Sequence, residues 1–417
     1  MAMDVIFVLL GVALVLFFGF FAEFVFRKTG IPDVLFLIIL GFVIGPNVLN
    51  YISSTQFIEV APLFTTFTLL FLLFDGAFNI HLSSLIREFS NSFLLTLFNF
   101  VISTIVVGVV MMFSGYSILI SLLTGFILGG VSSSFVIPIL KQLNISEHIY
   151  SLLTLESALT DVFCIVFSLT VLEILNLGGF GFQETFSQLA ALFAIAGFIG
   201  AIAGVIWIFL TVKVFKEPHY MVTIAYLLMV YVVTEFLRGN GAIATLFLGL
   251  VLKNSKQLTF IFKGIKNPAY KKLKNKISKD QQVISVVKPQ EQFFYDQISF
   301  LLKTFFFVYI GLLIDISDTR VLIIGGIISF ILLFSRTASL LFTKRIETDD
   351  PSLSLINSMF ARGLAAAAIT QVVLQAGLPQ ANFIASVTYV VITGTIILSS
   401  VRIFFVRRSL PKREVKA

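Results

Sequence analysis

The chain has 417 residues, of which 58% are hydrophobic and only 12% are charged, and its mean hydropathy is +1.02. Soluble domains are about 45–50% apolar and about 25% charged, so this composition excludes a soluble fold. A transmembrane helix needs about 20 apolar residues, whereas a transmembrane barrel shows alternating segments of about ten residues. Continuous apolar runs such as 5–26 and 94–113 therefore predict an all-α, polytopic membrane protein.

Polar and Gly/Pro-rich segments divide the chain into thirteen predicted transmembrane helices. In chain order they cover 5–26, 34–50, 57–80, 90–113, 117–140, 149–177, 187–213, 219–237, 242–252, 298–316, 321–343, 353–377 and 383–406. Of the 29 Lys and Arg residues, 23 follow odd-numbered helices or lie in the C-terminal tail, two lie on the opposite side and four lie within helices. Because basic residues concentrate in cytoplasmic loops, this pattern predicts an outside N-terminus and a cytoplasmic C-terminus.

Residues 1–406 form the predicted transmembrane domain, with a basic cytoplasmic loop at 253–297 and a basic tail at 407–417. The loop holds ten lysines between Lys253 and Lys288. Clusters of this kind are attracted to anionic lipid headgroups. We expect a solvated connector at the bilayer surface, and no binding of nucleic acid.

Two pairs of segments indicate an internal duplication. Gly130–Ile137 in the fifth helix aligns with Gly363–Thr370 in the twelfth, and Phe71–Gly76 in the third aligns with Phe306–Gly311 in the tenth. The offsets are similar, and the paired helices are seven apart, so the two halves have opposite orientations. Transporters built from inverted repeats often carry interrupted helices at the substrate site. The sequence therefore predicts two inverted six-helix repeats with broken helices 5 and 12.

Ionisable groups inside a membrane cost about 2.5–3.5 kcal/mol each and usually mark function. The predicted helices place a few such groups deep in the bilayer: Asp75, Glu156, Asp161, Lys303, Arg336 and Arg362. Ser157 and Asp161 lie four residues apart and share one helix face. A carboxylate with hydroxyls and carbonyls suits a monovalent cation, and a carboxylate also takes a proton. The alternative for Asp161 is a hydrogen bond in helix packing.

A candidate buried ion pair and a candidate helix break accompany this site. Glu156 and Arg336 carry opposite charges, so we expect them to neutralise each other as a buried pair. The segment Ser132-Ser133-Ser134 follows Gly129-Gly130 and is a candidate helix break, whose half-helix ends would offer carbonyls to a cation. The alternative is an intact helix with the serines bonded back to its carbonyls.

With these residues placed, the chain resembles the monovalent cation:proton antiporter superfamily, nearer its sodium/proton exchanger branch of prokaryotic type. The resemblance covers residues 5–406. It rests on Phe74-Asp75-Gly76 in helix 3, Glu156-Ser157-x-x-Thr160-Asp161 in helix 6, Gly311-Leu312 in helix 10, Arg336 in helix 11 and Arg362-Gly363 in helix 12.

The resemblance implies an alternating-access antiporter with no resident cofactor and no enzymatic activity. Its partners would be the bilayer, protons, monovalent cations and a second copy of the chain, in the plasma membrane. Spans 1–3 and 8–10 would form the dimer scaffold, and spans 4–6 and 11–13 the ion-carrying core. The implied ion and proton site consists of Asp161, Ser157, Asp75, Ser133 and Thr160, with Asp161, Ser157 and Asp75 as cation ligands. Glu156 and Arg336 would be a structural pair, and Lys303 and Arg362 further core charges.

Three departures from the family pattern bear on the transported cation. Thr160 replaces the usual Asn, Asp75 replaces a Glu, and Ser132-Ser133-Ser134 stands where exchangers commonly have Thr-Asp-Pro. The last is more similar to the potassium-efflux branch. Exchange of Na⁺ for protons is the first interpretation, and K⁺/H⁺ exchange or potassium-efflux-type transport is the alternative.

Two other classes of protein fit less well. An ion channel would need rings of carbonyls or charges around one axis. An intramembrane aspartyl protease would use Asp75 and Asp161, but the chain has no His-Glu-x-x-His motif for metalloprotease chemistry and no other enzymatic signature.

Overall fold

The structure is a computed structural model that describes residues 2–49, 61–78, 92–143, 145–177, 182–211, 214, 220–255, 289–339 and 350–407. Every regular element within these ranges is helical. They are α1 (Ala2–Thr29), α2 (Asp33–Ile44), α3 (Ala61–Phe78), α5 (Ser92–Phe113), α6 (Ile118–Ile127), α7 (Ser133–Gln142), α8 (Glu147–Leu177), α9 (Phe182–Leu210), α10 (Tyr220–Phe236), α11 (Gly241–Lys253), α14 (Pro289–Leu313), α15 (Thr319–Ser335), the 3-10 helix η3 (Arg336–Ser339), α17 (Asp350–Ser358), α18 (Leu364–Gln375) and α19 (Ala381–Arg407).

The lengths and apolar composition of these helices confirm the class of multi-pass membrane protein. Seven of the described helices are long and apolar enough to cross a membrane, namely α1, α5, α8, α9, α14, α15 and α19. Large apolar side chains remain exposed along them, such as Phe17 at 75% and Phe20 at 66% on α1, as a lipid-facing surface requires. Each of the thirteen predicted ranges contains one or two described helices. The number of crossings and the inverted repeats stay predictions.

One boundary differs clearly from the sequence-based expectation. The tenth predicted helix starts near 298, whereas α14 begins at Pro289. Proline is favoured in the first turn of a helix, because its missing N–H is not needed there, so the polar stretch that follows it is helical rather than loop. The rest of the predicted basic loop, 256–288, and the tail from 408 lie outside the described residues.

The chain divides into two compact units. The smaller unit comprises 70–87 and 179–299, and its described part contains α9, α10 and α11 with the adjoining ends of α3 and α14. Trp207 of α9 stacks on Tyr226 of α10, with ring centroids 4.5 Å apart. The side chain of Asn240 accepts a hydrogen bond from the amide of Ile243 and caps the start of α11.

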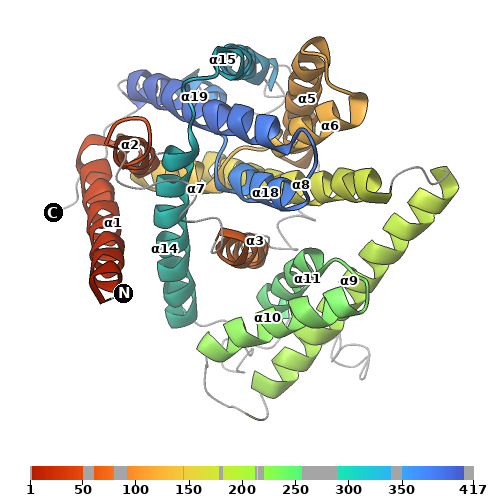
Figure 1. Ribbon diagram of the computed structural model, residues 1–417. Coiled ribbons are helices and arrows are strands. Elements are labelled where there is room, and N and C mark those ends of the chain that lie inside the picture. The colour runs from red at the N-terminus through yellow and green to blue at the C-terminus, as the bar shows by residue number, and fades with distance from the viewer. Residues whose placement is uncertain are drawn as a thin grey trace. The chain divides into compact units, whose positions relative to one another are not determined.

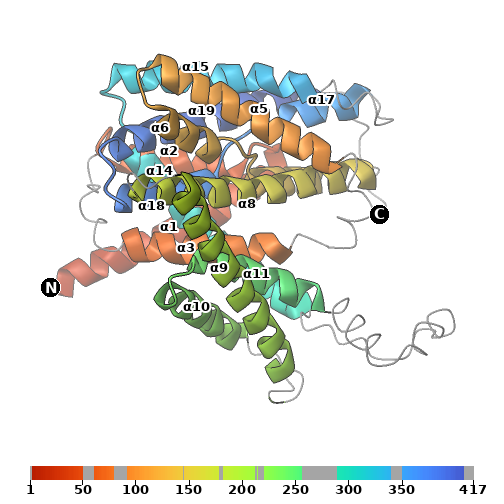
Figure 2. The ribbon, with the colours of Figure 1, turned by 90° about the vertical axis from the view of Figure 1, so that its right-hand side faces the viewer.

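The larger unit comprises 1–69, 88–178 and 300–417. Within it, α5, α15 and α19 lie side by side (Figures 1 and 2), and α8 packs against α5, α6, α7 and α18. This arrangement surrounds α8, which carries Glu156 and Asp161, with other helices. A membrane helix with acidic side chains is stable only if those groups face protein rather than lipid.

The larger unit also contains both helix breaks that the sequence predicts. Helix α6 ends at Ile127 and α7 begins at Ser133, while α17 ends at Ser358 and α18 begins at Leu364. The two breaks touch, because the amide of Ser132 donates a hydrogen bond of 2.9 Å to the carbonyl of Ala361. A backbone amide freed from its helix must find such a partner inside a membrane protein.

A glycine in each break permits close packing at this point. A Cβ at Gly363 would collide with the side chain of Ser132. A Cβ at Gly130 would lie 2.5 Å from Sγ of Cys164 and 2.8 Å from the carbonyl oxygen of Thr160. The absence of a side chain at Gly363 therefore lets the two breaks meet, and its absence at Gly130 lets the first break lie against α8.

Candidate functional site

Asp161 lies against the start of the half-helix α7. Its Oδ2 accepts hydrogen bonds from the amide of Ser133, at 3.2 Å, and from the hydroxyl of Ser133, at 2.5 Å. Ser133 is the first residue of α7, and the N-terminal amides of a helix lack intrahelical partners and carry partial positive charge. Oδ1 of Asp161 has no hydrogen-bond partner among the described residues. The carboxylate is thus anchored through one oxygen and has the other available for a cation or a proton.

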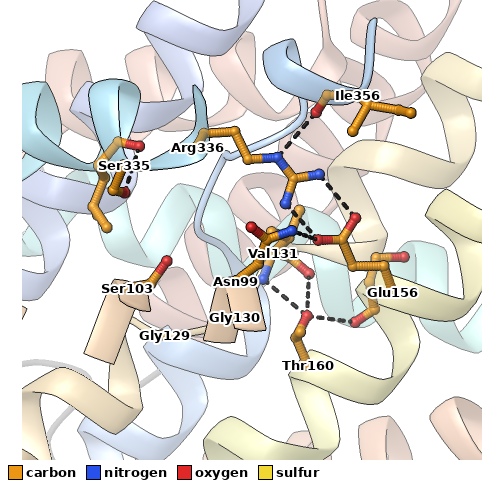
Figure 3. A network of polar contacts seen from close by, with 12 residues as sticks. Asn99, Ser103, Gly129, Gly130, Val131, Glu156, Thr160, Ser335, Arg336 and Ile356 are labelled. Carbon is orange, nitrogen blue, oxygen red and sulfur yellow. Dashed lines mark hydrogen bonds and ion pairs between the residues drawn. The ribbon is translucent and has the colours of Figure 1, made fainter. Parts of the chain in front are cut away.

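Ser157 and Thr160 lie on the same helix as Asp161 but point to different partners. The buried hydroxyl of Ser157 donates to the carbonyl of Thr154 at 3.0 Å. The hydroxyl of Thr160 accepts a hydrogen bond of 3.0 Å from the amide of Val131, and it can donate its proton to the carbonyl of Val131 or of Ser157 (Figure 3). Thr160 therefore holds the broken segment against α8, one residue before Asp161.

Arg362 binds the carbonyls at the end of α6. Its Nη1 donates to the carbonyl oxygens of Gly129, at 3.3 Å, and of Gly130, and its own amide donates to the hydroxyl of Thr395 at 3.0 Å. The side chain is 2% exposed and forms no ion pair with a carboxylate in the described part of the chain. Carbonyls that the sequence suggested for a cation are thus already bound to a guanidinium, which carries the positive charge there permanently.

Glu156 and Arg336, which the sequence pairs, form a bidentate ion pair (Figure 3). Nη2 of Arg336 lies 2.8 Å from Oε2 of Glu156, and Nη1 donates to Oε1. Nε of Arg336 donates to the carbonyl of Ile356 at 3.0 Å, near the C-terminal end of α17. Each first half-helix, α6 and α17, therefore ends at carbonyls that bind a buried arginine.

A second buried ion pair was not predicted from the sequence. Nζ of Lys303 on α14 lies 2.5 Å from Oδ2 of Asp33, the first residue of α2, and Asp33 is 3% exposed. Lys303, a candidate core charge, is therefore neutralised by Asp33. An Asp after Pro32 reads as an ordinary helix-start residue. The sequence did indicate that an acidic partner must exist, because Lys303 lies deep in a predicted membrane helix and its charge must be neutralised there.

Asp75 belongs to the smaller unit and has its own polar partners there. Its Oδ2 accepts a hydrogen bond of 3.2 Å from the hydroxyl of Ser299, and its charge interacts with that of Lys253. The residues that the larger unit brings together are thus Asp161, Ser133, Thr160 and Ser157, with both arginines at the ends of the half-helices.

Interrupted membrane helices whose half-helix ends meet at a polar site inside the membrane are the architecture of secondary transporters. The sequence profile described as "Sodium/hydrogen exchanger, transmembrane" matches residues 12–407. The chain therefore belongs to the sodium/hydrogen exchanger family.

Individual relatives are more distant. The chain is 32% identical over 187 residues to the Na(+)/H(+) antiporter ApNhaP of Aphanothece halophytica, a match that covers 44% of this chain and 36% of that protein. It is 28% identical over 191 residues to Na(+)/H(+) antiporter 1 of Methanocaldococcus jannaschii, covering 45% of this chain and 43% of the relative. These matches span less than half the length of either relative.

A solved structure shares the fold along nearly the whole chain. The sodium proton antiporter MjNhaP1 from Methanocaldococcus jannaschii, determined at pH 8, superposes with a TM-score of 0.76 over 98% of this chain and 99% of that one, at 20% identity. A second structure of the same antiporter, from electron microscopy, gives a TM-score of 0.72 at 19% identity over the same shares of the two chains.

Proposed function

We propose that the protein is a secondary antiporter that exchanges Na⁺ for protons across the membrane. The observation that carries the proposal is Asp161, whose Oδ2 is bound to Ser133 at the start of a half-helix while Oδ1 has no partner among the described residues. Membership of the sodium/hydrogen exchanger family supports the reaction class, as do the two relatives named as Na(+)/H(+) antiporters.

Coupling follows from competition at one carboxylate. In the deprotonated form Asp161 binds the cation, and Ser157 of the same helix contributes a further oxygen; a proton that binds Asp161 displaces the cation. Spans 4–6 and 11–13 then move against spans 1–3 and 8–10 and carry whichever ligand is bound. Because one carboxylate holds either one Na⁺ or one proton, exchange through Asp161 alone is electroneutral.

The contacts of the two buried arginines support Asp161 as the group that binds both the cation and the proton. Arg362 binds the carbonyls of Gly129 and Gly130, so a transported cation relies on Asp161 rather than on these oxygens. Glu156 and Arg336 neutralise each other, so Asp161, five residues further along α8, is the carboxylate beside the break that is not held in an ion pair within the described residues.

The cellular setting is part of the same proposal. The distribution of basic residues favours an outside N-terminus and a cytoplasmic C-terminus in the plasma membrane. We propose a homodimer that serves cation and pH homeostasis.

Proton flux in proteoliposomes tests the function. Purified protein is reconstituted, a pH gradient is imposed, and Na⁺, Li⁺ or K⁺ is added in turn to wild type, Asp161→Asn and the matched control Asp315→Asn, which changes an exposed loop aspartate. We expect Na⁺-driven proton movement in wild type and the control, and none in Asp161→Asn. Exchange that persists in Asp161→Asn contradicts the mechanism, a response to K⁺ alone establishes the potassium alternative, and no flux with any cation contradicts the reaction class.

A further inference from the structure

Helix α5 carries a buried polar stripe on an otherwise apolar membrane helix. Thr96, Asn99, Ser103 and Thr104 are all buried, whereas Val101 and Ile105 are exposed at 43% and 56%. Polar side chains within a membrane helix face other protein groups, because lipid offers them no hydrogen bonds. These four polar side chains therefore face neighbouring helices rather than lipid.

Asn99 contacts the first of the two arginine networks. Its Nδ2 donates a hydrogen bond of 2.9 Å to Oε1 of Glu156, the same oxygen that accepts from Arg336 (Figure 3). A neutral amide that donates to a carboxylate oxygen fixes the orientation of that carboxylate. Asn99 thereby helps to hold Arg336, whose Nε reaches the carbonyl of Ile356 at the end of α17.

Ser103 contacts the second arginine. Its hydroxyl accepts a hydrogen bond of 2.9 Å from Nη2 of Arg362, whose Nη1 binds the carbonyls of Gly129 and Gly130 after α6. Asn99 and Ser103 are four residues apart and so lie one above the other on one face of α5. One helix face therefore contacts the groups that bind the ends of both half-helices.

The same turn of α5 is packed tightly enough to act as a rigid support. The ring of Phe100 stacks on Phe126 of α6 at 6.0 Å and meets Phe163 of α8 edge-on at 5.5 Å. A Cβ at Gly125 of α6 would lie 2.6 Å from the carbonyl oxygen of Thr104. The backbones of α5 and α6 are thus in direct contact beside the first break.

We infer that Asn99 and Ser103 are positioning residues for ion exchange. They hold the Glu156–Arg336 pair and Arg362 at a fixed separation, and through them the two breaks, so that Ser133 keeps its hydrogen bonds to Asp161. Neither residue touches the transported ion. This inference rests on the proposed exchange function and adds α5 to the machinery that shapes its site.

Transport kinetics of purified, reconstituted variants test the inference. Ser103→Ala removes a hydroxyl that accepts from Arg362, and Asn99→Leu removes the donor to Glu156. Thr104→Val is the matched control, because it removes a neighbouring buried hydroxyl that has no hydrogen-bond partner in the described residues. Ser103→Thr, which keeps the hydroxyl, is the rescue variant.

We expect the apparent KM for Na⁺ to rise about tenfold in Ser103→Ala and Asn99→Leu, the lower end for loss of a hydrogen bond to a charged group, with an altered pH profile. Thr104→Val and Ser103→Thr should keep the KM and the profile of wild type. A purely structural role lowers the yield of folded protein without moving either readout, so wild-type KM and profile in Ser103→Ala overturn the inference even if Asn99→Leu does not fold. Absence of exchange in wild type would instead refute the proposed function.

Discussion

The hydroxyl of Ser133 lies 2.5 Å from Oδ2 of Asp161, although the two residues belong to different helices, α7 and α8. The contact exists because α7 starts afresh after the break at 128–132 and presents its first residue to α8. In an uninterrupted helix the Ser133 amide would donate to a carbonyl of the preceding turn and would not be available to Asp161. The break therefore gives Asp161 two donors that a continuous helix could not supply together.

Loss of the Ser133 hydroxyl should weaken cation binding. In Ser133→Ala the charged carboxylate loses a hydrogen bond worth about 1.5–3 kcal/mol, and the charged form is the one that binds Na⁺. We expect the apparent affinity for Na⁺ in proteoliposomes to fall about tenfold or more. Ser134→Ala is the matched control. Ser134 is the next residue of α7, and its side chain has no hydrogen bond within the described residues. Equal affinities in the two variants would contradict the role of Ser133.

Much of this site could be read from the sequence, because membrane burial makes every charge conspicuous. The apolar runs marked the helices, Gly129-Gly130 before three serines marked the first break, and Glu156 with Arg336 stood out as opposite charges. What each partner touches could not be read in the same way. Arg362 binds carbonyls 232 and 233 residues away along the chain, a contact that only the crossing of the two breaks creates.

Asp33 shows why contacts between distant parts of the chain could not be predicted from the sequence. At the start of an apolar run, an Asp is a common first-turn residue that favours the positive end of the helix. Its partner Lys303 belongs to α14 and lies 270 residues further along the chain. No local pattern contains that information.

Breaking the Glu156–Arg336 pair should destabilise the protein strongly. Both side chains are almost fully buried, and removal of one partner from a buried pair costs about 3–5 kcal/mol because the other charge is left unpaired. We expect Glu156→Gln and Arg336→Met each to lower the thermal unfolding temperature of purified protein in detergent, and Glu156→Leu/Arg336→Met together to recover part of the loss.

The exposed pair of Arg27 and Glu23 provides the control for that experiment. Its N···O distance is 2.6 Å, but the Arg27 side chain is 72% exposed, and pairs of this kind contribute about 0–1 kcal/mol. Arg27→Met should leave the unfolding temperature nearly unchanged. A loss as large as that of Arg336→Met would show that burial is not the cause.

Lys303 should matter for stability rather than for ion binding. Its charge is neutralised by Asp33, so Lys303→Gln leaves a buried carboxylate without its partner and should lower the unfolding temperature. The double variant Asp33→Asn/Lys303→Gln has neither charge, and we expect it to regain stability and to exchange Na⁺ with the KM of wild type. Lys141→Gln, at an exposed position on α7, is the control. A raised KM in the stable double variant would instead assign Lys303 to the transport site.

A methyl group at Gly363 should disrupt the crossing of the two breaks. The added Cβ of Gly363→Ala would occupy the position of the Ser132 side chain, so one of the interrupted segments must move. Because the amide of Ser132 is bonded to Ala361 and α7 starts at the next residue, that movement displaces Ser133 from Asp161. We expect Na⁺/H⁺ exchange to be lost, and to return in part in Gly363→Ala/Ser132→Gly, where the colliding side chain is absent.

Gly326→Ala, where nothing lies within 4 Å of the new Cβ, is the control and should exchange like wild type. Full activity of Gly363→Ala on its own would mean that the two breaks do not need this close contact.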